Sequence, residues 1–106
     1  MDNRILKENV QEIVKELREI AELFYQQNDS EAFEKFDLTI DKIENLIDNL
    51  NKYYEENREI EFNKEKICSI LSEAMEALES EDKILMADIL QYDFVEYIEE
   101  IFNKIS

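Results

Sequence analysis

NRILKENVQEIVKELREIAELFYQQ, residues 3–27, is the stretch from which the fold class of this chain follows. Its apolar side chains return every three or four residues, which is the spacing of one face of an α-helix. Asp2 or Asn3 can cap the start of this helix. We therefore expect an amphipathic helix over residues 3–27, with a turn at residues 28–30. The expected core positions are Leu6, Val10, Ile13, Val14, Leu17, Ile20, Ala21 and Phe24.

A second segment repeats this pattern, and we expect it to be helical over residues 30–56. Asn28 or Ser30 can start it, since both are good helix N-caps. Beyond its polar end, Ile60 and Phe62 are expected to fold back onto the core. The expected core stripe is Phe33, Phe36, Ile40, Ile43, Ile47, Leu50 and Tyr54.

Two further helices are expected over residues 64–79 and 81–104. Asn63 is the expected N-cap of the third, and Phe62 and Ile67 have the spacing of a hydrophobic staple. A turn is expected around Ser80, because the apolar stripe stops there. Glu81 and Asp82 would then lie in the first turn of the fourth helix, where negative charge suits the helix dipole. The expected core stripes are Ile67, Leu71, Ala74 and Leu78 in the third helix, and Ala87, Leu90, Phe94, Ile98, Ile101 and Ile105 in the fourth.

The connections between these helices are short, and the chain has no Gly and no Pro. Without these residues, β-hairpins and Gly-rich phosphate loops are hard to build. Short connections favour antiparallel neighbours. The prediction is therefore a single domain over residues 1–106, all-α, in the form of an up-down antiparallel four-helix bundle.

The residues that most enzymes need are missing. There is no His, which is the commonest general base and a common metal ligand. The single Cys68 can form neither an intrachain disulfide nor a cysteine zinc site, and we expect it to be a half-buried structural residue. The sequence thus predicts no enzyme activity, no catalytic residue, no cofactor and no metal.

The net charge of −16 comes from 28 acidic and 12 basic residues. Nucleic acids and anionic membranes both require a basic surface, so neither is an expected partner. No signal-peptide core and no apolar run of membrane-spanning length is present. We therefore expect a cytoplasmic protein whose partner is another protein.

The first half of the fourth helix is apolar nearly all round. If Ala87 and Leu90 face the core, Leu85, Ile89 and Tyr92 should point outward, with Asp88 on the border of this strip. The strip is the expected partner-binding site, as a homodimer seam or as a docking groove for a partner helix. Alternatively, the linker at residues 57–62 covers it. If the strip is a surface, replacing Ile89 with Asp should leave the chain folded.

An acidic stripe on the second helix supplies an alternative surface. Its members recur at helical spacing, about 100° round from the core stripe. They are Asp37, Asp41, Glu44, Asp48 and Glu55. The stripe is either a solvated face or a binding surface. In the second case this chain would be an acidic regulatory protein that uses the stripe to bind a basic partner or to mimic nucleic acid.

Residues 77–92 contain the pattern A-L-E-x-x-D-x-x-x-x-A-D-I-L-x-Y. This pattern resembles one in small, acidic helical proteins of Gram-positive bacteria that have no assigned activity. The resemblance implies a cytoplasmic accessory role, and it marks Asp82, Asp88 and Tyr92 as residues of interest.

Overall fold

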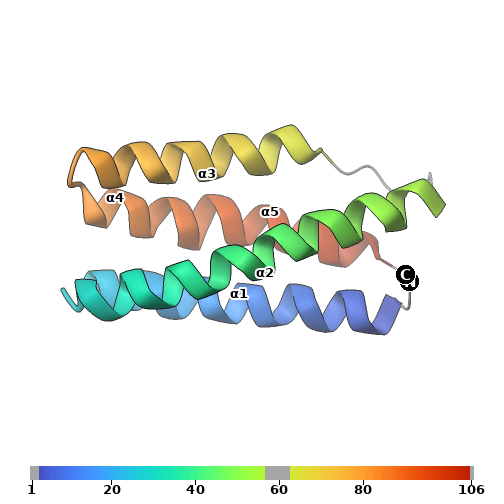
Figure 1. Cartoon of the computed structure of the whole chain (residues 1–106), viewed down its shortest axis with the longest axis horizontal. Coiled ribbons are helices and arrows are strands. Elements are labelled where there is room, and N and C mark those ends of the chain that lie inside the picture. Colours follow the sequence, from blue (N-terminus) through green and yellow to red (C-terminus); the bar gives the residue numbers. More distant parts are fainter. Residues whose placement is uncertain (1–2, 57–62, 106) are drawn as a thin grey trace.

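The computed structural model of the chain describes residues 3–56 and 63–105 (Figure 1). Every regular element in these two ranges is helical, which confirms the all-α class. The last three elements follow one another without a break and form one rod over residues 83–104. The elements are α1 (Asn3–Tyr25), α2 (Asp29–Glu56), α3 (Lys64–Glu79), α4 (Lys83–Asp88), the π-helix η1 (Ile89–Phe94) and α5 (Val95–Lys104).

The helices lie lengthwise in an elongated body of 42 × 22 × 19 Å. Figure 1 shows α3 beside the last rod, with α1 below it and α2 crossing obliquely in front. The helix α1 packs against α2 and against all three parts of the last rod, whereas α3 packs against α4 and η1. None of the helices in the described ranges has the length and apolarity needed to cross a membrane.

The core row of α1 matches the sequence prediction. All eight of its expected core residues are buried, and they join one continuous apolar cluster. Large aliphatic side chains occupy nearly every position of this row, so no neighbouring row competes with it.

The core row of α2 differs from the predicted one. Ala32, Thr39, Leu46 and Tyr53 are buried, although the predicted row passed over them. Together with Phe36, Ile43 and Leu50, they form a row of alternating steps of four and three, the spacing typical of helices packed at a shallow angle. Phe33 and Ile40, which were expected in the core, are only partly buried at its edge. The prediction was wrong here because Ala32 and Thr39 have little apolar surface to mark them. Inside the core, the Thr39 hydroxyl donates to the Lys35 carbonyl oxygen at 2.9 Å.

The turns after α1 and α3 use the same geometry. Gln27 and Glu81 both adopt the left-handed conformation, with φ of 63° and 61°. The amides of the following residues, Asn28 and Asp82, donate to the carbonyls of Leu23 and Ala77 at 2.8 and 2.9 Å. This is the Schellman ending, which usually places Gly at the left-handed position. Since the chain has no Gly, two long side chains occupy these strained positions instead.

The helix starts agree with the prediction in α3 and differ slightly in α4. The Asn63 side chain accepts from the Lys66 amide, which confirms it as the N-cap of α3. Asp82 was expected within the first turn of the fourth helix; it is instead the N-cap of α4, and its side chain accepts from the Leu85 amide at 3.0 Å. The expected roles of Asp2, Ile60 and Phe62 lie outside the described residues.

The π-helix η1 sets which residues of the last rod share a face. The Val95 amide donates to the Leu90 carbonyl, five residues back. Such a turn holds one residue more than an α-helical turn. Residues four apart therefore stay in line through this segment, and the buried row runs Met86, Leu90, Phe94 and Ile98.

Candidate functional site

The predicted strip of Leu85, Ile89 and Tyr92 does not form one outward face. Leu85 and Tyr92 are 46% and 56% exposed, but Ile89 is only 7% exposed and belongs to the core. The prediction that Ile89 points outward was therefore wrong. The strip was drawn with steps of four and three, whereas η1 aligns residues that are four apart. Leu85, Ile89 and Asp93 consequently share one row, and Asp88 and Tyr92 belong to the next.

The first of these rows borders a groove between α3 and α4, which we call the α3–α4 groove. It is open, with a volume of about 580 Å³. Ala77 and Ile89 are buried at its base, and Leu85 stands exposed in its wall. Its lining residues are Glu73, Glu76, Ala77, Ser80, Asp82, Leu85, Ile89 and Asp93.

The rim of the α3–α4 groove is acidic on both sides. Glu73 and Glu76 lie on α3, Asp93 lies in η1, and Asp82 lies at the turn between the two helices. All four residues are exposed, and none of the described residues that line the groove is basic. Within the described part of the chain, no basic side chain pairs with any of the four. The nearby Lys83 is turned to α2, where its Nζ lies 2.6 Å from the Asp29 carboxylate.

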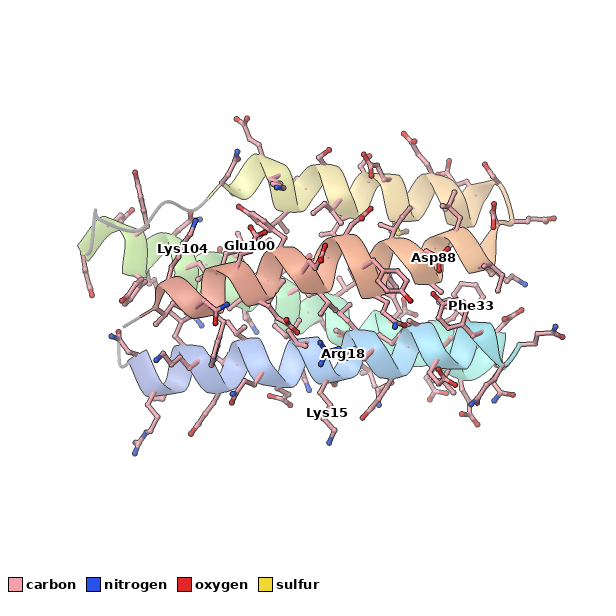
Figure 2. All side chains as sticks on the ribbon, turned by 180° about the vertical axis from the view of Figure 1, so that it is seen from behind. Lys15, Arg18, Phe33, Asp88, Glu100 and Lys104 are labelled. Carbon is pink, nitrogen blue, oxygen red and sulfur yellow. The ribbon has the colours of Figure 1, made fainter. Side chains whose placement is uncertain are left out.

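Asp88 and Tyr92, the second pair of predicted site residues, both lie near Tyr25 of α1. Asp88 is labelled on the last rod in Figure 2. The Tyr25 hydroxyl donates a hydrogen bond to the Asp88 carboxylate and so ties α1 to α4. Burial and this carboxylate raise the pKa of Tyr25 above its ordinary value, and the nearby Tyr92 contributes. Asp88 is thus engaged within the fold, while Tyr92 remains exposed beside it.

The acidic stripe of α2 is exposed along its whole length, at Asp37, Asp41, Glu44, Asp48 and Glu55. Two lysines of the same helix turn toward α1. Lys35 pairs with Glu19, and Lys42 pairs with Glu12 and Glu16 at 2.8 and 2.9 Å. These lysines therefore bind α1 instead of neutralising the stripe. Among the described residues, Lys52 lies near the stripe, since it lines an open depression together with Asp48.

A further groove, of about 600 Å³, lies between α1 and α5. Val10, Val14 and Phe102 supply its apolar part. Its charged rim is mixed, and Arg18 bridges the two helices with a 2.5 Å contact to Glu99. Figure 2 shows Arg18 on the side of α1 that faces α5. Because both members of this ion pair line the groove, the groove has no single charge preference.

Groups suited to chemistry are sparse on these surfaces. Over residues 3–56 and 63–105, no three acidic or cysteine side chains lie together as a possible metal site. Cys68 was expected to be half-buried, but it is exposed on α3. This prediction was wrong because residue 68 lies one position beyond Ile67, on the solvent side of the buried row.

Sequence reasoning missed the contribution of α3 to the groove. Glu73, Glu76 and Ser80 recur at steps of three and four on an outward face, and Ala77 between them is small. This pattern could have indicated a shallow acidic channel. It gives no sign, however, that the channel faces Leu85, because that depends on how α3 packs against α4.

The fold and these surfaces define an acidic, all-helical domain with an apolar, acid-rimmed groove. A family model matches residues 5–104, and the chain therefore belongs to that family, described as a domain of unknown function, DUF8042. Neither a curated protein nor a solved structure matches the chain. The matched range contains both the α3–α4 groove and the α2 stripe.

Proposed function

We propose that this protein is a non-catalytic protein-interaction module, an adaptor or chaperone-like accessory protein, that binds its partner in the α3–α4 groove. Leu85 carries the proposal: it is 46% exposed in the wall of a groove whose base is apolar. A partner that covers it would gain about 25 cal/mol for each Å² of apolar surface removed from water. The proposal includes the up-down antiparallel four-helix bundle as its scaffold and needs no cofactor.

The proposed occupant is a different protein, in place of the homodimer that the sequence suggested. A twofold dimer places the same surface patch of each copy against the other. If two α3–α4 grooves faced each other, the rim carboxylates of Glu73, Glu76 and Asp93 in one copy would lie against the rim carboxylates of the other copy. Like charges in such an interface cost free energy. We also propose a cytoplasmic location, because an unpaired Cys68 suits a reducing compartment.

The test is an affinity pull-down from lysate of the native host, using wild type, Leu85→Lys and Ile84→Lys. Ile84 is the matched control because it is 50% exposed on the same helix but does not line the groove. We expect one protein to be enriched by wild type and by Ile84→Lys, and to be lost with Leu85→Lys. Circular dichroism checks that all three are folded. Retention by Leu85→Lys, or equal loss with both variants, would contradict the proposal.

A second candidate is an acidic regulatory protein that binds a basic partner, or mimics nucleic acid, through the α2 stripe. The exposure of all five stripe carboxylates favours it. It predicts that combining Asp41→Asn, Glu44→Gln and Asp48→Asn abolishes capture, whereas Leu85→Lys leaves it intact. The opposite pattern rules this candidate out in favour of the groove.

A further inference from the structure

We propose that the segment seated in the α3–α4 groove is an amphipathic helix of the partner, with lysine or arginine on both sides of its apolar face. This inference rests on the proposed function, and it adds the chemistry of the partner. The groove lies between two helices that pack side by side, and the residues along its α4–η1 wall, from Leu85 to Asp93, span about two helical turns.

The apolar contacts favour a helix over other peptide conformations. An added β-strand needs an exposed sheet edge, and the described residues include no strand. Polyproline segments dock on grooves lined by aromatic side chains, and no aromatic side chain stands among the described residues that line this one. A helix instead presents side chains at steps of three and four, which can straddle Leu85 and reach the base formed by Ala77 and Ile89.

The charges of the groove identify the flanks of that helix. Carboxylates stand on both walls, with Glu73 and Glu76 on α3 and Asp93 in η1. Because none of them is paired with a basic side chain of the described chain, they are available to one from a partner. A phosphorylated or acidic segment would be repelled by the same rim. Basic residues on both borders of an apolar face would match both walls at once.

The test uses a fluorescent designed peptide with leucines along one helical face and lysines on both borders. Binding to the full chain is followed by fluorescence anisotropy from about 50 to about 500 mM NaCl, since salt screens exposed charges. We expect binding that weakens with salt. We also expect Leu85→Lys to lower the affinity for the peptide by about tenfold or more, because the substitution removes apolar contact and adds a repelling charge. A scrambled peptide of the same composition should bind at least about tenfold more weakly, because it presents no continuous apolar face.

The acidic rim is tested with a matched pair of double variants. Glu73→Gln with Glu76→Gln should weaken binding about three- to tenfold, as expected for two exposed ion pairs. Glu31→Gln with Glu34→Gln removes the same charge at the same spacing, from exposed residues of α2 that do not line the groove. It should change the affinity by less than about twofold, because it breaks no direct ion pair with the peptide.

The inference is overturned if both double variants weaken binding equally, if the scrambled peptide binds as well, or if the designed peptide does not bind. It is also overturned if amide chemical shifts map the peptide to α2. None of these results removes the proposed function, which stands or falls on the separate comparison of Leu85→Lys with Ile84→Lys. Capture that Leu85→Lys retains, or that both variants lose equally, would instead remove the proposed function.

Discussion

Replacing Ile89 by Ala should destabilise the protein far more than replacing Leu85 by Ala. The two side chains are isomers, so each substitution removes the same number of carbon atoms. They lie one turn apart in the same row of the last rod, and both line the α3–α4 groove. Their environments differ: Ile89 is 7% exposed and Leu85 is 46% exposed.

The expected difference follows from these exposures. A buried Ile→Ala substitution costs about 2–5 kcal/mol, and the lower half of this range applies where water can enter from a groove. Burying an aliphatic side chain completely is worth about 1.5–3 kcal/mol, so half-buried Leu85 should lose about 1 kcal/mol. The better helix propensity of Ala returns a few tenths of a kcal/mol in both cases. The free energies of unfolding of the two variants should thus differ by about 1–2 kcal/mol.

Urea unfolding followed by circular dichroism measures both values, provided that the slopes with urea agree with wild type. Equal losses at the two positions would refute the assignment of Ile89 to the core and Leu85 to the surface. The same reasoning corrects the variant that the sequence suggested. Ile89→Asp places a charge at a core position, so we expect it to unfold the chain, whereas Leu85→Lys should leave it folded.

Three further predictions concern the turns, caps and alkaline stability. Gln27→Gly and Glu81→Gly should each stabilise the fold by about 0.5–1 kcal/mol in urea unfolding, because Gly relieves the left-handed strain; no gain at either site would contradict the turn geometry. Asn63→Ala and Asp82→Ala should each cost about 1 kcal/mol, measured in the same way, since each loses a helix cap; unchanged stability would speak against the caps. The pKa of Tyr25 is raised by burial and by its hydrogen bond to α4, so the stability that it contributes is present below about pH 10 and is lost as pH rises through the folded pKa. Thermal unfolding should therefore show wild type more stable than Tyr25→Phe at pH 7 and the gap closing above about pH 10; a constant gap would count against this coupling.

The helical class and the α1 core could be predicted from the sequence, because large aliphatic side chains fill a single row of that helix. It failed where the packing residues are small or polar. Ala32 and Thr39 face the core of α2, although Phe33 and Ile40 beside them are more apolar. Which row faces inward depends on how closely α2 approaches α1, and hydrophobic periodicity alone does not contain that distance.

The candidate site was predicted in part. Leu85 was placed correctly on the surface, and Ile89 does lie in its row, but Ile89 is buried. Tyr92 was assigned to that row by the spacing of an ordinary α-helix. The extra residue of η1 moves Tyr92 to the α1 side and Asp93 to the groove. The steps of four from Met86 to Ile98 are the sequence signal for this change, because they exceed 3.6 residues per turn.

Photo-crosslinking in the native host tests the central claim most directly. A benzophenone amino acid is placed at position 85 in one variant and at position 84 in another, and the crosslinked peptides are identified by mass spectrometry. We predict that position 85 crosslinks to a basic, amphipathic helical segment of one other protein, and that position 84 does not. Crosslinks from position 85 to a second copy of this chain, or the same products from both positions, would contradict the account.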